Sequence, residues 1–176
     1  NVEIDPRGGV FSRGGYERIN GTAVSGTWSP KRLHRFTGAT PRIMLTTGEK
    51  VYQSTGGNFS VLEFSAGNDI AVSYAYGASF ANWGSDLYIA TGVDGAGGYS
   101  WVSSDAYATA IDVLTVATFN NDYAAPAANR FPKADLLAVH ANKMFAAGVD
   151  EDGVNYPNRL RWSHEDSPKD WAEADY

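Results

Sequence analysis

The stretch DLYIATG at residues 86–92 has two counterparts in this chain of 176 residues, KVYQSTG at 50–56 and KMFAAG at 143–148. Each consists of an aliphatic residue, an aromatic residue, two or three small residues and a glycine that ends the pattern. The aromatic residues of the three stretches are Tyr52, Tyr88 and Phe145. A short aromatic-rich run that ends at glycine is typical of a β-strand followed by a turn. The repetition predicts one supersecondary unit used three times.

The sequence around each stretch repeats as well. Extended apolar segments precede the stretches at 43–45, 70–76 and 136–139, and segments that alternate apolar with polar residues follow them at 59–64, 99–102 and 159–162. Alternation with period two indicates a half-buried strand. We therefore expect Tyr52, Tyr88 and Phe145 to lie in equivalent second strands of successive units. The segment 111–119 is a candidate fourth strand of the middle unit.

The units predict an all-β fold with β-propeller-like blades of antiparallel strands, since they recur at about the spacing of a blade. The spacing is irregular, so a β-sandwich is the alternative. Nineteen glycines and ten tyrosines suit short strands joined by tight turns, and 43% hydrophobic residues can bury a core. The chain is short for a complete propeller, so it is expected to be an incomplete fragment of a longer chain. Cysteines are absent, which excludes disulfides and thiolate metal sites.

Charge divides the chain unevenly. Residues 1–42 carry seven of the fourteen basic residues but three of the twenty acids, within a net charge of −6. We predict an N-terminal basic strand or hairpin segment at 1–40 and blades at 41–176. A basic segment beside an acidic body favours contact with another protein. The predicted protein-interface residues are Arg7, Arg13, Arg18, Lys31, Arg32 and Arg35.

No constellation of catalytic residues is recognisable, so neither an enzyme nor a cofactor is predicted. The acidic turn at 150–153 is a weak calcium candidate through Asp150, Asp152 and Asn155, because Ca²⁺ prefers six to eight oxygen ligands. The turn offers too few, so no metal is expected to be needed for folding. A glycoside hydrolase needs two facing carboxylates, whereas the expected inner strands are mostly Ala, Ser and Tyr.

Trp83 lies in a loop-like stretch, FANWG at 80–84, and is the candidate for stacking on a glycan. A carbohydrate-binding propeller or adhesin at the host cell surface is therefore the alternative function. No stretch approaches the roughly 18 apolar residues of a membrane span, so no membrane segment is expected.

Two parts of the chain resemble propeller-containing tail proteins of bacteriophages. The opening, NVEIDPRGGVFSRGGY at 1–16, resembles the start of such proteins. The segment 135–171 resembles one of their blades, with the spacing Arg159-x-x-Trp162-Ser163 followed by Pro168-x-x-Trp171. The resemblance implies a tail nozzle, hub or minor tail protein that forms an oligomeric ring around the DNA path. It also implies a virion location after assembly in the host cytoplasm. Other tail proteins, copies of itself and transient DNA in the lumen are the implied partners.

Overall fold

The structure is a computed structural model that describes residues 2–4, 10–12, 30–73, 75–113, 130–151 and 153–171. Every regular element in these ranges is a β-strand, which confirms the predicted all-β class. The strands are β1 (Val2–Ile4), β2 (Val10–Ser12), β3 (Arg32–Phe36), β4 (Arg42–Thr46), β5 (Val51–Ser54), β6 (Ser60–Val61), β7 (Glu63–Ser65), β8 (Asn68–Asp69), β9 (Ser79–Trp83), β10 (Asp86–Ala90), β11 (Gly98–Val102), β12 (Thr109–Val113), β13 (Arg130–Phe131), β14 (Lys133–His140), β15 (Lys143–Glu151) and β16 (Val154–Trp162).

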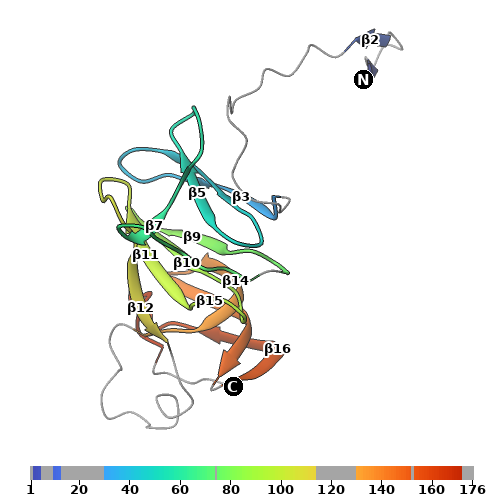
Figure 1. Ribbon diagram of the computed structural model, residues 1–176. Helices are drawn as coiled ribbons and strands as arrows, with labels where there is room; N and C mark the ends of the chain where they lie inside the picture. Colours follow the sequence, from blue (N-terminus) through green and yellow to red (C-terminus); the bar gives the residue numbers. More distant parts are fainter. Residues whose placement is uncertain are drawn as a thin grey trace.

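Three antiparallel sheets make up the body of the fold, and each follows the order of the chain (Figure 1). The first sheet is β3-β4-β5-β6, the middle sheet is β9-β10-β11-β12, and the last sheet is β14-β15-β16. The short β13 joins the middle sheet in parallel beside β12. Two small ladders, β1-β2 and β7-β8, lie outside the three sheets.

The middle sheet is buried on both faces. Side chains alternate across a strand, so Leu87 and Ile89 of β10 point to one face while Tyr88 and Ala90 point to the other. All four are buried. A strand covered on both faces is a continuous apolar run, as in the sequence of β10.

Each face of the middle sheet packs against a different sheet. The first core cluster joins one face to the first sheet, through Phe36, Met44, Val51, Phe80, Leu87, Ile89, Tyr99 and Trp101. The second core cluster joins the opposite face to the last sheet, through Ala81, Tyr88, Ala90, Ile111, Phe131, Ala134, Met144, Ala146, Val149 and Trp171. The three sheets are therefore stacked in chain order.

The first strands of the three sheets meet at one side of the stack. β9 contacts both β3 and β14. The Leu137 backbone amide in β14 donates to Ser79 Oγ in β9 at 2.9 Å. His34 in β3 stacks on Phe80 in β9 with ring centroids 5.6 Å apart.

The predicted equivalence of the three aromatics is only partly correct. Tyr88 and Phe145 lie in the second strands of their sheets, β10 and β15, whereas Tyr52 lies in β5, the third strand of the first sheet. The cause is β3, an additional strand that precedes the expected unit. Phe145 is also half-exposed, and Met144 beside it is the residue that is buried in the second core cluster.

The apolar segment 70–76 was expected to form the strand before β10, but none of its described residues lies in a strand, and β9 at 79–83 takes that place. Other predictions around these strands are confirmed. The expected strand at 99–102 lies within β11, the third strand of the middle sheet, where Trp101 is buried. The fourth strand is β12 at 109–113, which overlaps the predicted segment 111–119 at 111–113. Residues 114–119 lie outside the described ranges. The expected boundary between 1–40 and 41–176 falls in the connection between β3 and β4, which pair in one sheet. The division into two domains stays a prediction.

Two of the hairpin turns do not depend on glycine. Ala141 and Asn142 both have positive φ, 47° and 57°, as the two-residue turn between β14 and β15 requires. At the turn before β5, Thr47 Oγ1 accepts from the backbone amides of Glu49 and Lys50 at 3.2 Å each. That side chain, rather than a positive φ at Gly48, shapes the turn.

Candidate functional site

Asp135 lies where the three sheets converge. Its carboxylate Oδ1 accepts from the Val93 backbone amide at 3.2 Å, so β14 is tied to the loop after β10. Its backbone carbonyl accepts from Arg32 Nη1 in β3 at 2.8 Å. Gly92 has φ of 88°, and a Cβ there would lie 2.3 Å from Ser73 Cβ. The junction therefore needs glycine at this position, and its contacts hold the sheets together.

His34 and Arg32 in β3 also bond within the fold. His34 Nε2 and Asn82 Oδ1 are 2.9 Å apart, and Asn82 Nδ2 donates to the Arg35 carbonyl at 3.1 Å. Burial lowers the pKa of Arg32, and the nearby negative charge of Asp135 partly offsets that effect. The first strand is thus anchored to its neighbours through polar contacts.

The six predicted interface residues have different positions. Arg7, Arg13 and Arg18 lie outside the described residues. Lys31 and Arg35 are exposed, whereas Arg32 is half-buried at the junction. Of the six, Lys31 and Arg35 are the described residues that the fold leaves open to a partner.

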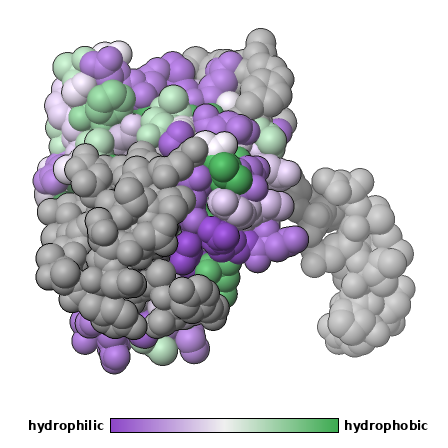
Figure 2. All heavy atoms as spheres, turned by 90° about the horizontal axis from the view of Figure 1, so that it is seen from below, coloured by the Kyte–Doolittle hydropathy of each residue, from purple (hydrophilic) through white to green (hydrophobic). Residues whose placement is uncertain are grey.

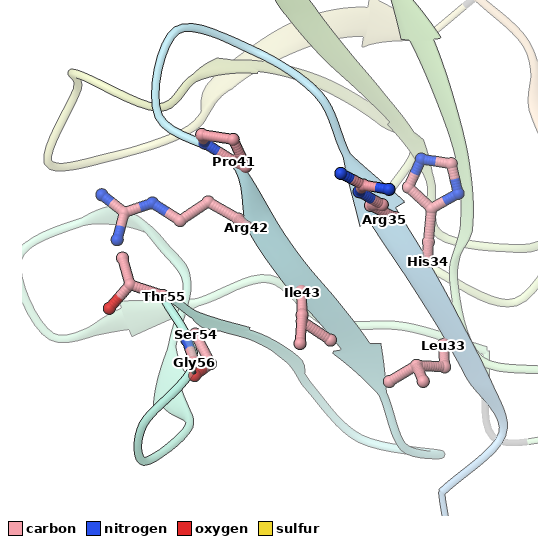
Figure 3. Close-up of a pocket in the computed structure, with 9 residues that line it drawn as sticks. All are labelled: Leu33, His34, Arg35, Pro41, Arg42, Ile43, Ser54, Thr55 and Gly56. Carbon is pink, nitrogen blue, oxygen red and sulfur yellow. Dashed lines mark hydrogen bonds between the residues drawn. The ribbon is translucent and has the colours of Figure 1, made fainter. Parts of the chain in front are cut away.

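An open cleft of about 420 Å³ lies on the first sheet beside Arg35 (Figure 3). Leu33, Pro41 and Ile43 provide its apolar lining, and Arg42 adds a second guanidinium. Leu33 is 69% exposed, the largest exposed fraction among the exposed large hydrophobic residues of the described chain. Leu33, Arg35 and Ile43 lie on the face opposite His34 and Phe36, because strand side chains alternate. The cleft is therefore on the face of the first sheet that points away from the middle sheet.

The calcium candidates do not form a cluster in the described chain. Asp150 Oδ1 accepts from the Gly153 backbone amide at 3.0 Å, Asn155 is exposed, and Asp152 lies outside the described residues. Within the described ranges, no three His, Cys, Asp or Glu residues come together as metal ligands. The expectation that folding needs no metal stays a prediction.

Glu151, in the same turn region, is a buried charged residue whose partners the sequence analysis does not predict. It is 2% exposed and accepts from Arg159 Nη1, and from Arg161 Nε at 2.8 Å and Nη2 at 3.1 Å. Arg159 stacks on the Tyr156 ring at 3.7 Å. The signal was the basic pair Arg159-x-Arg161 on the strand that returns from this turn. Since the carboxylate is satisfied by two guanidinium groups, its role is structural.

Trp83 does not lie in a loop as expected: it is the last residue of β9 and is half-buried against the second core cluster. Part of its ring is thus occupied by packing within the chain. The structure does not bring it together with the other candidate residues.

The last sheet has an exposed apolar face. Leu136 pairs with Ala147, which pairs with Leu160, and all three point to one face. Leu136 and Leu160 are 52% and 49% exposed. Figure 2, which views the molecule of Figure 1 from below, shows hydrophobic residues at the surface between hydrophilic ones.

Two tyrosines buried in the stack have altered acidity. Burial, with a smaller contribution from the Asp86 carboxylate, raises the pKa of Tyr88 to about 12. Burial also raises the pKa of Tyr99. Both phenols stay protonated as packing groups of the core at neutral pH.

In the described ranges, no helix is long and apolar enough to cross a membrane. No family model, curated protein or solved structure matches the chain.

Proposed function

We propose that this chain is a structural protein that assembles through propeller-like blades into an oligomeric ring of a bacteriophage tail, around the DNA path. The propeller-like arrangement is supported by the burial of the middle sheet, whose two faces are covered by the sheets before and after it in the chain. Blades of a propeller pack in this serial way. The phage tail is proposed from the resemblance at 1–16 and 135–171.

The meeting of β3, β9 and β14 supports blades rather than unrelated sheets. These are the first strands of consecutive sheets, and β9 contacts both of the others. In a propeller, the innermost strands of adjacent blades lie side by side around the axis. Asp135 and Arg32 then occupy inner positions, where their bonds hold neighbouring blades in register.

The way the fold uses its polar side chains supports a role that depends on shape. Arg32, His34, Asp135 and Glu151 all bond to groups of the same chain. Groups that are engaged in holding strands together are poor candidates for acid–base work. The proposal therefore assigns no catalytic step to this chain.

Charge supports a position around passing DNA. Outside residues 1–42 the chain carries seventeen acids and seven bases. An acidic lumen would repel phosphate groups and keep DNA from binding during ejection.

Sedimentation velocity of the purified protein over a wide concentration range tests the assembly part of the proposal. We expect a discrete oligomer to accumulate as concentration rises, because an assembling structural protein obeys mass action. A monomer at every concentration would contradict self-assembly.

A further inference from the structure

Apart from the pair His140 and Lys143 at the β14–β15 turn, the outer face of the last sheet consists of small, aliphatic and aromatic side chains. Ladder pairing places them in two rows across the three strands: Leu136, Ala147 and Leu160 in one row, and Ala138, Phe145 and Trp162 in the next. The Phe145 and Trp162 rings lie 6.4 Å apart. Leu137, Ala146 and Met144 point to the opposite face, where the latter two are buried in the second core cluster.

This face has the composition of the sheet faces that the chain buries. Both faces of the middle sheet carry similar rows of aliphatic and aromatic residues, and these rows are buried against the neighbouring sheets. On the last sheet, Leu136 and Leu160 keep about half of their surface exposed. Contiguous exposed apolar surface of this kind marks a contact with another protein. Another sheet is the layer that the existing stack predicts for this position.

The opposite end of the stack offers a complementary surface. The first sheet points its cleft away from the middle sheet, and the cleft is lined by Leu33, Pro41 and Ile43 (Figure 3). An open apolar cleft at one end and exposed leucines at the other permit the same sheet-on-sheet packing between two copies.

Charged side chains lie near both surfaces. Glu165 and Asp166 are exposed in the segment after β16, at the same end of the last sheet as Lys143, and the Asp166 backbone amide donates to the Asn142 carbonyl at 2.9 Å. This bond holds the acidic pair at the end of the last sheet where Trp162 lies. Lys31 and Arg35 are exposed on the first sheet. Opposite charges on facing surfaces guide association and fix its register.

We propose that the outer face of the last sheet docks on the first-sheet cleft of a second copy, so that copies join head to tail. This cleft, lined by Leu33, Pro41 and Ile43, is called the Leu33 cleft below. This inference rests on the proposed self-assembly and names its two surfaces. A head-to-tail contact uses two different surfaces of each copy, and it closes into a ring when the rotation between copies permits.

The test uses one aspartate on each surface and a matched control. Leu160→Asp blocks the outer face, Leu33→Asp blocks the cleft, and Val154→Asp is the control on the same strand as Leu160, since Val154 is 51% exposed but belongs to neither surface. Sedimentation velocity should show Val154→Asp assembling as the unmodified chain does. Each of the other two should raise the dissociation constant roughly tenfold or more, because a charge is inserted at a central apolar contact.

Mixing the two blocked variants identifies the pairing. The Leu160→Asp copy keeps its cleft and the Leu33→Asp copy keeps its outer face, so the mixture should form a heterodimer and nothing larger. Circular dichroism checks folding, and Leu136→Asp on the neighbouring strand repeats the outer-face test if Leu160→Asp is misfolded.

Other outcomes overturn the inference in distinguishable ways. If the unmodified chain assembles and Leu160→Asp assembles equally well, the outer face is not the contact, although self-assembly stands. If Leu33→Asp assembles normally while Leu160→Asp does not, outer faces pair with each other and the cleft is not used. If the unmodified chain never assembles, both the inference and the proposed self-assembly fail.

Discussion

Arg161 forms a two-point ion pair with Glu151 across β15 and β16, with Nε donating to Oε1 at 2.8 Å and Nη2 to Oε2 at 3.1 Å. Arg159 Nη1 shares the second oxygen. The carboxylate is 2% exposed and the Arg161 side chain is 15% exposed, so most of this pair is out of water. It lies where the pairing of β15 with β16 shifts register, between Ala147 and Val149.

Removal of the Glu151 carboxylate should strongly destabilise the last sheet. Glu151→Ala leaves the guanidinium of Arg161 largely buried without its anion, which costs about 3 kcal/mol. Urea unfolding followed by fluorescence measures the loss. Glu165→Gln is the control, because Glu165 is exposed and its neutral variant should unfold within about 0.5 kcal/mol of the original. Equal stability of the two variants would contradict a structural role for Glu151.

Gly98 provides a test of the close packing behind the middle sheet. A Cβ at Gly98 would lie 2.3 Å from Phe131 Cδ1 in the second core cluster, although Gly98 has no positive φ. Gly98→Ala should therefore destabilise the protein by about 1–3 kcal/mol through overpacking.

The matched control is Gly57→Ala, since nothing lies within 4 Å of a Cβ at Gly57. Thermal unfolding should show little change there. A Gly98→Ala variant as stable as Gly57→Ala would mean that Phe131 does not pack on β11 as described.

The sequence predicts the strands better than their positions in the sheets. The run LYIA at 87–90 is apolar at consecutive residues, as expected of a strand with two covered faces, and it lies in β10. KMFAAG and RLRW lie in β15 and β16. The sequence pattern predicts Tyr52 in a second strand, whereas it lies in the third, because β3 has the basic sequence RLHRF, which resembles the basic leading segment rather than a strand of the unit. The local pattern holds no information about an additional strand that pairs ahead of the unit.

The polar contacts were harder to predict. Glu151 belongs to the acidic run at 150–152, which is typical of a solvated turn, and only the pairing of β15 with β16 brings Arg159 and Arg161 to it. Likewise Asp135 meets Val93 from 42 residues away. Contacts of this kind depend on which strands pair and in which register, and the local patterns of a single sequence do not reveal this.

Tyr88 should titrate late, and its protonation should stabilise the fold. Its pKa in the folded protein is about 12, against about 10 in an unfolded chain. The folded protein therefore holds this proton between pH 10 and pH 12 when the unfolded chain has lost it, so stability is complete below about pH 10 and falls as pH rises toward 12.

Absorbance at alkaline pH measures this effect. Tyr88→Phe should remove a late-titrating phenol, and its stability should fall less steeply over the same interval. Tyr76→Phe, which removes an exposed tyrosine, should leave that late step in place. Identical titration curves for the unmodified chain and Tyr88→Phe would contradict the burial of this hydroxyl.

Arg35 tests the role of charge in assembly. Arg32 is unsuitable for a charge reversal, because its guanidinium already donates to the Asp135 carbonyl inside the fold. Arg35→Glu should slow assembly at low salt by roughly tenfold or less, and the difference should shrink at high salt as the charges are screened. Arg35→Gln should have a smaller effect. Light scattering after dilution measures the rate, and salt-independent equality of all three proteins would contradict charge-guided association.

Electron microscopy of the purified protein tests the central claim most directly. The account predicts closed rings in which each copy places the outer face of its last sheet, with Leu136 and Leu160, on the Leu33 cleft of the next copy. Particles of the size of a single chain at every concentration, with no rings, would contradict a protein that acts by assembly.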